Sequence, residues 1–183
     1  MFVTDKMISD IIAQYGQPKL KSFDIKITEK DYQVIRSSQK NDRNHDVTLY
    51  IFKDDKIIVI AKPFYPSGLF RAPSGGLNPG EGLIEGAKRE ALEETGCEIE
   101  FEKFLLQTEV NFHTTNQSIK WRSFVFRAKY LSGNFEFTDK REIREVRLVK
   151  LEEFEQFSKI MRKSQIGGLH YRASLHDVIK DLL

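Results

Sequence analysis

Residues 75–97 have the sequence GGLNPGEGLIEGAKREALEETGC, in which a glycine-rich loop runs directly into a proline-free segment. That segment is rich in Ala, Leu, Glu and Lys, and we expect it to form an α-helix over residues 83–95. Gly96 then stands where a left-handed C-cap glycine ends a helix. A glycine-rich loop lets its backbone approach a ligand closely, and a helix start favours anions. This stretch therefore predicts a site for an anionic ligand.

Three glutamates gather along one edge of this expected helix. Glu90 and Glu94 are one turn apart, and Glu93 lies beside them. The apolar stripe next to this edge (Ile84, Ala87 and Ala91) would pack the helix on a sheet. Like charges at such spacing destabilise a helix by about 0.2–0.5 kcal/mol per pair. Mg²⁺ or Mn²⁺ would offset this repulsion, because hard divalent cations are the natural partners of clustered carboxylates.

Gly86 lies one helical turn before Glu90, and glycine costs about 1 kcal/mol relative to alanine inside a helix. Two explanations are equally good. One is room for a substrate phosphate or a metal-bound water beside Glu90. The other is close packing against a neighbouring loop.

The spacing of the whole segment matches G-x5-E-x7-R-E-U-x-E-E-x-G-U, where U is an apolar residue. The seven fixed positions are Gly75, Glu81, Arg89, Glu90, Glu93, Glu94 and Gly96, and Ala91 and Cys97 fill the apolar positions. This pattern is the Nudix box, so the chain resembles the Nudix hydrolase superfamily. The resemblance implies an α/β fold of the Nudix type, an α/β/α sandwich with a mixed β-sheet between helices. It also implies Mg²⁺- or Mn²⁺-dependent hydrolysis of a nucleoside diphosphate linked to another group, by attack of water at phosphorus.

The resemblance also implies roles for individual residues. Glu90, Glu93 and Glu94 would hold the metal with help from Gly75. The resemblance also implies that Glu93 and Arg89 are catalytic residues. Arg89 would pair with a box glutamate, for which we expect Glu81. Ligand-supporting groups of this kind commonly carry 10- to 100-fold effects.

A general base is expected outside the box, because a bound cation lowers the pKa of its carboxylate ligands. Chain order in the family places residues 139–145 over the metal site, and Glu142 is the first candidate there, with Glu145 as the alternative. Arg71 and Lys62 precede the box and are candidates for substrate phosphate binding. The alternative for each of these four residues is an exposed surface charge.

The rest of the chain indicates a mixed arrangement of helices and strands. We expect a helix at residues 7–15, one or two strands within 22–35, and a β-hairpin formed by 47–52 and 57–61. The proline- and glycine-rich residues 62–82 are expected to form a long functional loop. Strands are expected at 98–111, 119–130 and 143–150, and helices at 151–162 and 171–183. This order lacks the regular alternation of a doubly wound parallel sheet.

Composition narrows the class of protein. The 183 residues include 29 Lys and Arg against 27 Asp and Glu, and this small excess gives no reason to expect nucleic acid or a membrane as partner. The single cysteine, Cys97, excludes an intramolecular disulfide and is interpreted as buried packing. Residues 1–12 lack the apolar core of a signal peptide, so we expect no export and a cytoplasmic location.

We expect an N-terminal extension over residues 1–43, holding a helix, strands in an extra sheet and a hypothetical homodimer contact, followed by a Nudix domain over 44–183. Two other functions compete with hydrolysis of a small-molecule nucleotide derivative. A non-catalytic Nudix-fold module that senses nucleotides usually loses box carboxylates, and this chain keeps them all. An isopentenyl-diphosphate isomerase uses a cysteine upstream of the box, where this chain has none. The sequence does not indicate which nucleotide or leaving group is used.

Overall fold

The computed structural model describes residues 3–39, 41 and 43–183. Its helices are α1 (Asp5–Tyr15), α2 (Glu29–Ser38), α3 (Leu83–Thr95), α4 (Glu153–Lys163) and α5 (Gly167–Ile179). Its strands are β1 (Lys19–Lys26), β2 (His45–Lys53), β3 (Lys56–Ala61), β4 (Ser74–Gly75), β5 (Cys97–His113), β6 (Ser118–Gly133) and β7 (Glu145–Val149).

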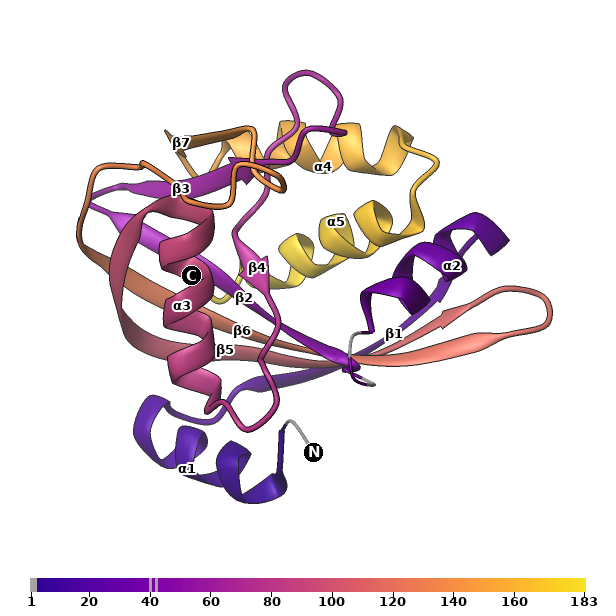
Figure 1. Ribbon diagram of the computed structural model, residues 1–183, viewed down its shortest axis with the longest axis horizontal. Coiled ribbons are helices and arrows are strands. Elements are labelled where there is room, and N and C mark those ends of the chain that lie inside the picture. Colours follow the sequence, from indigo (N-terminus) through magenta and orange to yellow (C-terminus); the bar gives the residue numbers. More distant parts are fainter. Residues whose placement is uncertain (1–2, 40, 42) are drawn as a thin grey trace.

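The strands form one mixed sheet between two layers of helices (Figure 1). The strand order is β1-β5-β6-β2-β3-β7, with β4 also paired to β2. β1 and β5 are parallel, as are β2 and β6, and the remaining pairs are antiparallel. The α/β/α sandwich with a mixed sheet is therefore confirmed.

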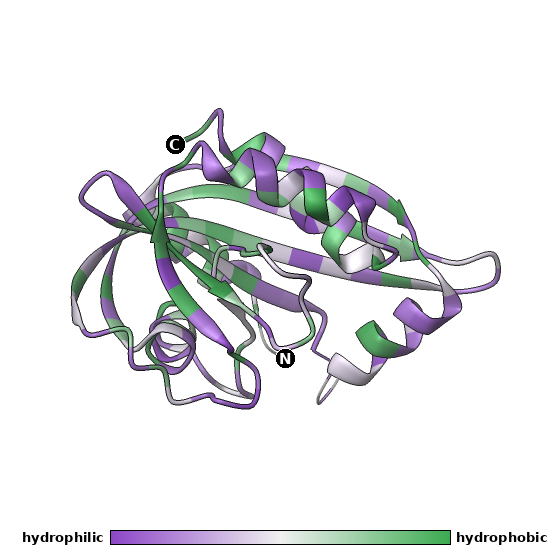
Figure 2. Ribbon diagram, turned by 90° about the horizontal axis from the view of Figure 1, so that it is seen from above, coloured by the Kyte–Doolittle hydropathy of each residue, from purple (hydrophilic) through white to green (hydrophobic). Residues whose placement is uncertain are grey.

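Each face of the sheet has its own apolar core. One core joins the sheet to α1 and α3, through residues such as Ile11 and Ala91. The other joins it to α4 and α5, through residues such as Phe154 and Leu175. In Figure 2 the central strands are largely hydrophobic, whereas the helices carry hydrophobic residues on only part of their circumference. Burial of these two apolar faces is the main force that holds the layers together.

Two short connections place the functional segment. The hairpin of β2 and β3 pairs Ile51 with Ile58, as expected, and β4 pairs with the earlier part of β2, where Val47 faces Gly75. The loop from β4 then leads into α3, which ends at Gly96 with a left-handed φ of 68°. A Cβ atom at Gly96 would lie 2.6 Å from the carbonyl oxygen of Glu136, so glycine is required at this helix end for space as well as conformation.

Of the one or two strands expected within residues 22–35, one is present as β1, and the second half of this range forms α2 instead. Thr28 and Asp31 form a capping box: the Thr28 hydroxyl accepts from Asp31 N at 3.1 Å, and the Asp31 carboxylate accepts from Thr28 N at 3.3 Å. Val34 is a β-branched residue of the kind that is common in strands, but here its side chain is exposed on the surface of α2. The cap decides the local structure, because it satisfies backbone donors that a helix start leaves free.

The N-terminal residues share the sheet with the rest of the chain. β1 pairs in parallel with β5, from Lys19 opposite Leu106 to Lys26 opposite His113, so the expected extra sheet is replaced by an added strand. The division at residue 43 and the homodimer contact stay predictions. Cys97 is buried with a free thiol, as expected. Within the described residues, no helix combines the length and apolar character needed to cross a membrane.

His176 gives the fold a dependence on pH. Its ring stacks on Phe154 and its Nδ1 lies 3.1 Å from the hydroxyl of Tyr50. Burial lowers its pKa to about 4, the charge of Lys180 acts in the same direction, and Asp177 opposes both. The unfolded chain therefore binds the proton more readily, and the stability that His176 contributes above pH 6.5 is lost as the pH falls towards 4.

Replacing His176 with glutamine removes this titration while keeping a polar partner for Tyr50. We expect the free energy of unfolding of the wild type to fall more than that of His176→Gln between pH 6.5 and 4, by up to about 3 kcal/mol. Urea unfolding at a series of pH values measures the difference. Parallel stability curves for the two proteins would contradict the assignment.

Candidate active site

Helix α3 holds an arginine that joins the acidic side chains of the box. Arg89 Nε donates to Glu81 Oε1 at 2.8 Å, and Arg89 Nη1 donates to Glu90 Oε1 at 2.9 Å and to Glu93 Oε2 at 3.1 Å. Its Nη2 also donates to the carbonyl of Gly76 at 3.0 Å. Hydrogen bonds from Arg89 hold the pKa of Glu81 below its ordinary value. The expected pair of Arg89 with Glu81 is present, and it ties the loop before α3 to the helix.

Glu90 lies directly against the backbone of β4. A Cβ atom added at Gly75 would be 2.0 Å from the Glu90 carboxylate, so only glycine leaves room for this carboxylate. Burial raises the pKa of Glu90 above its ordinary value, against the opposing effects of Arg89 and Arg43.

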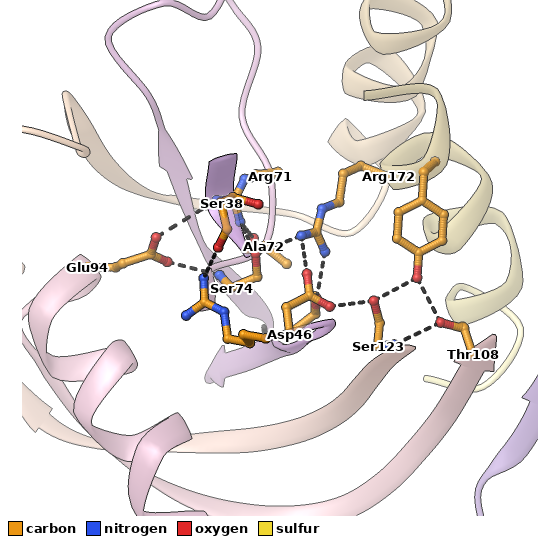
Figure 3. Close-up of polar contacts among 12 residues, drawn as sticks. Ser38, Asp46, Arg71, Ala72, Ser74, Glu94, Thr108, Ser123 and Arg172 are labelled. Carbon is orange, nitrogen blue, oxygen red and sulfur yellow. Dashed lines mark hydrogen bonds and ion pairs between the residues drawn. The ribbon is translucent and has the colours of Figure 1, made fainter. Parts of the chain in front are cut away.

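Glu94 is the most deeply buried carboxylate of the box, with 4% of its surface exposed. Its Oε2 accepts a hydrogen bond from the backbone N–H of Ser74 at 2.9 Å, and its Oε1 lies 3.8 Å from Arg71 Nη2 (Figure 3). Burial raises the pKa of Glu94 to about 7; the charges of Arg71 and Lys62 oppose this rise and that of Glu90 adds to it. Glu90 and Glu94 are therefore held over the consecutive residues Ser74 and Gly75.

This pair of carboxylates fits a hard divalent cation. Both are oxygen donors, Glu94 is buried and Glu90 is partly buried, and the pKa values of both are raised, so a bound cation would relieve the cost of keeping them charged. Glu93 differs in exposure, because its carboxylate is half exposed, although it shares the contact with Arg89 Nη1 with Glu90. Across the described residues, no three His, Cys, Asp or Glu side chains converge on one point. Of the three glutamates expected to act as one ligand set, Glu94 is buried, Glu90 is partly buried and Glu93 is half exposed, and their role as metal ligands stays a prediction.

The loop before β7 reaches the same end of α3. The backbone N–H groups of Thr138 and Asp139 both donate to the carbonyl of Glu93, at 3.1 and 3.2 Å. Further along this loop, Glu142 Oε2 lies 2.6 Å from Lys62 Nζ. The charge of Lys62 also acts on Glu94, so Lys62 lies between Glu142 and this buried carboxylate in its electrostatic influence. Glu145 is exposed at the start of β7, opposite Ala61.

Arg71 is buried, so the alternative of an exposed surface charge does not apply to it. It is 6% exposed, and its guanidinium donates to the Tyr65 hydroxyl, the Ala72 carbonyl and the Ser74 hydroxyl. The reason is a backbone bridge between Arg71 and Ile60, which folds this part of the loop onto β3. Arg71 therefore supports Ser74 and Glu94, and its expected contact with a substrate phosphate stays a prediction.

Gly86 is explained by packing. A Cβ atom there would lie 2.4 Å from Leu77 Cδ2 and 2.7 Å from Glu81 Oε2. Of the two explanations left open by the sequence, close contact with the neighbouring loop is the one that the structure supports. The absent side chain lets Glu81 reach Arg89.

Two groups of site residues were missed by the sequence analysis. Arg43 lies where a Cβ atom at Gly76 would be, with Nη1 2.0 Å from that position, and its Nε is buried with no hydrogen-bond partner in the described part of the chain. The second group is Asp46 and Arg172, which contact Ser74 and its surroundings. An arginine preceding a strand and one inside a helix carry no local signal of such contacts.

The fold and site define a class of protein. It is an α/β/α sandwich in which the acidic edge of α3 lies against the glycine-containing strand β4. The profile of the NUDIX domain matches residues 42–166, well over half of the chain. The chain therefore belongs to the Nudix family of hydrolases, as its box indicates.

Solved structures share this fold at low sequence identity. A NUDIX hydrolase from Nitrosomonas europaea is 21% identical with a TM-score of 0.53, over 73% of this chain and 89% of that one. A UDP-X diphosphatase is 20% identical with a TM-score of 0.51, over 94% of this chain and 79% of that one. No match is found among curated proteins.

Proposed function

We propose that this protein is a divalent-cation-dependent pyrophosphohydrolase that cleaves a nucleoside diphosphate linked to another moiety, with water attacking phosphorus. The observation that carries the proposal is the pair formed by the partly buried Glu90 and the buried Glu94 over Ser74 and Gly75, inside a complete box. A non-catalytic sensing module would have no need to keep two neighbouring carboxylates that repel each other. The likeness to a UDP-X diphosphatase agrees with a nucleotide substrate but, at 20% identity, does not indicate which one.

The proposed cation is Mg²⁺ or Mn²⁺, held by Glu90 and Glu94 with Gly75, and with Glu93 as a further ligand. When bound, such a cation neutralises the diphosphate and lowers the pKa of bound water. Arg89 keeps the carboxylates in position, and Arg71 and Ser74 hold Glu94. For Glu142 we propose the role of general base, and Lys62 beside it is proposed to contact a substrate phosphate. A cytoplasmic location is part of the same proposal.

A substrate screen tests this function. The panel comprises nucleoside triphosphates, ADP-sugars, dinucleoside polyphosphates and dinucleotide cofactors. We expect hydrolysis within this panel when Mg²⁺ or Mn²⁺ is present and no hydrolysis when EDTA is added. Mg²⁺ at about 100 times its Kd should raise the melting temperature by roughly 5–10 °C, because only the folded chain gathers the carboxylates. A non-hydrolysable diphosphate analogue should raise it further. An equal shift with NaCl at matched ionic strength, together with no hydrolysis of any compound, would contradict the proposal.

Arg43 is proposed as a phosphate-binding residue, because its buried Nε has no hydrogen-bond partner among the described residues and its charge already acts on Glu90. We expect Arg43→Ala to raise KM by roughly 10- to 100-fold, the effect of losing a charge-assisted hydrogen bond, with a smaller change in kcat. Arg36→Ala is a matched control, since Arg36 is an exposed arginine on α2 that contacts only Gln39 among described partners. Equal KM values for Arg43→Ala and the control would exclude the role.

A further inference from the structure

Helix α5 contributes an arginine that reaches across to β4. Arg172 Nη1 donates to the Thr48 hydroxyl at 2.8 Å, and Nη2 donates to the Ser74 hydroxyl at 3.0 Å. The same guanidinium forms an ion pair with Asp46, which is 5% exposed. Figure 3 shows this group converging on Ser74 from the side opposite Glu94. Arg172 lies beyond the residues that match the NUDIX domain, which end at 166.

Ser74 transmits these contacts to the buried carboxylate. Its hydroxyl oxygen accepts from Arg172 and also from Arg71 Nη1 at 2.8 Å, and two acceptor positions are all that a hydroxyl offers. Its backbone N–H donates to Glu94 at 2.9 Å. Two arginines thus fix the residue whose backbone holds Glu94.

The other side of Asp46 is fixed as well. Its carboxylate accepts from the Ser123 hydroxyl, which itself accepts from the Tyr171 hydroxyl at 2.8 Å. The Tyr171 oxygen is also 2.8 Å from the Thr108 hydroxyl oxygen. Tyr171 and Arg172 are consecutive in α5, and both therefore belong to the same hydrogen-bond network. This network fixes the rotation of α5 about its axis and its position on the sheet.

Such a network is a poor way to add stability. A buried ion pair loses much of its attraction to the desolvation of its two charges, and apolar residues often replace it without loss. Its geometry, in contrast, is specific: a planar guanidinium contacts Asp46, Thr48 and Ser74 at once.

We infer that Arg172 is a positioning residue of the active site, which together with Asp46 holds Ser74 so that the Glu94 carboxylate stays beside Glu90. The inference rests on the proposed function, because it concerns the cation site. It makes α5 a working part of that site, although the helix lies outside the segment that defines the family.

The experiment separates positioning from stability. Arg172→Met alone leaves the Asp46 charge buried without its partner, and we expect its melting temperature to fall by roughly 10 °C. The double variant Asp46→Asn/Arg172→Met removes both charges and should regain most of that loss. In this double variant we still expect Mn²⁺ affinity, measured by calorimetry, to be at least about 10-fold weaker, and kcat to fall at least about 10-fold with little change in KM.

Two further variants complete the test. Arg162→Gln is the control, because Arg162 forms an exposed ion pair with Asp177 of α5 and should leave Mn²⁺ affinity and kcat unchanged. Arg172→Lys keeps the charge for Asp46 but cannot make three contacts at once, so it should fold and yet show the same weaker Mn²⁺ binding.

The inference would be overturned by a stable double variant that keeps wild-type Mn²⁺ affinity and kcat. Where the double variant does not fold, the same result in Arg172→Lys would overturn it. Arg172 and Asp46 would then form a buried ion pair with no role in the active site. A wild-type protein that neither binds Mn²⁺ nor hydrolyses any substrate would instead overturn the proposed function, and the inference with it.

Discussion

Glu94→Gln is expected to lower turnover at least roughly 100-fold, by removal of a ligand from the carboxylate pair. Glutamine has nearly the size and the helix propensity of glutamate, so α3 should be retained. Its amide oxygen can still accept from Ser74 N, which now donates to Glu94 at 2.9 Å. The variant therefore removes the charge and leaves the surrounding contacts largely intact.

Stability without metal should move in the opposite direction from activity. Burial raises the pKa of Glu94 to about 7, which means that the folded chain disfavours the charged form. A neutral side chain avoids this cost, so the melting temperature of Glu94→Gln without Mg²⁺ should equal or exceed that of the wild type. Its rise on addition of Mg²⁺ should be smaller.

The matched control is Glu85→Gln, which makes the same change at an exposed position of the same helix. It should keep wild-type turnover and the full Mg²⁺ effect. Near-full activity in Glu94→Gln would remove the metal assignment. Glu93→Gln adds a comparison, because Glu93 contacts Arg89 at 3.1 Å: a loss as large as that of Glu94→Gln would place it among the ligands.

Local patterns predicted the parts of the structure that depend on neighbours in sequence. Residues that are close to one another in the sequence account for the hairpin of β2 and β3, for the helix α3 and for its Gly96 cap. The pair of Arg89 with Glu81 was expected on other grounds, because the resemblance to the Nudix family implies a box glutamate as partner for this arginine. The helix α2 was missed although its signal is local, since Thr28 and Asp31 were not recognised as a cap.

Contacts between distant segments could not be predicted in this way. Asp46 and Arg172 are 126 positions apart, and only the docking of α5 on the sheet brings them together. For Arg71 the sequence indicated a phosphate contact, with an exposed surface charge as the alternative, whereas the bridge to Ile60 buries its side chain beside Glu94. In both cases the side chain's role depends on tertiary packing, for which the sequence around it carries no periodic signal.

Glu142→Gln is expected to lower kcat by roughly 10²- to 10⁴-fold, the usual contribution of a positioned general base. Glu142 and Glu145 are both exposed, and Glu142 stays the first candidate because its Oε2 lies 2.6 Å from Nζ of Lys62, whose charge also acts on Glu94.

Two measurements distinguish a base from a ligand at this position. Since no proposed metal ligand is lost, KM and the Mg²⁺ dependence of Glu142→Gln should change little. A base must be deprotonated to act, so the wild-type rate should fall as the pH drops, and this acidic limb should flatten in the variant. Glu145→Gln, with the same change three residues away, should behave as the wild type. Unchanged kcat and pH profile in Glu142→Gln would exclude the residue, and a loss confined to Glu145→Gln would transfer the role to Glu145.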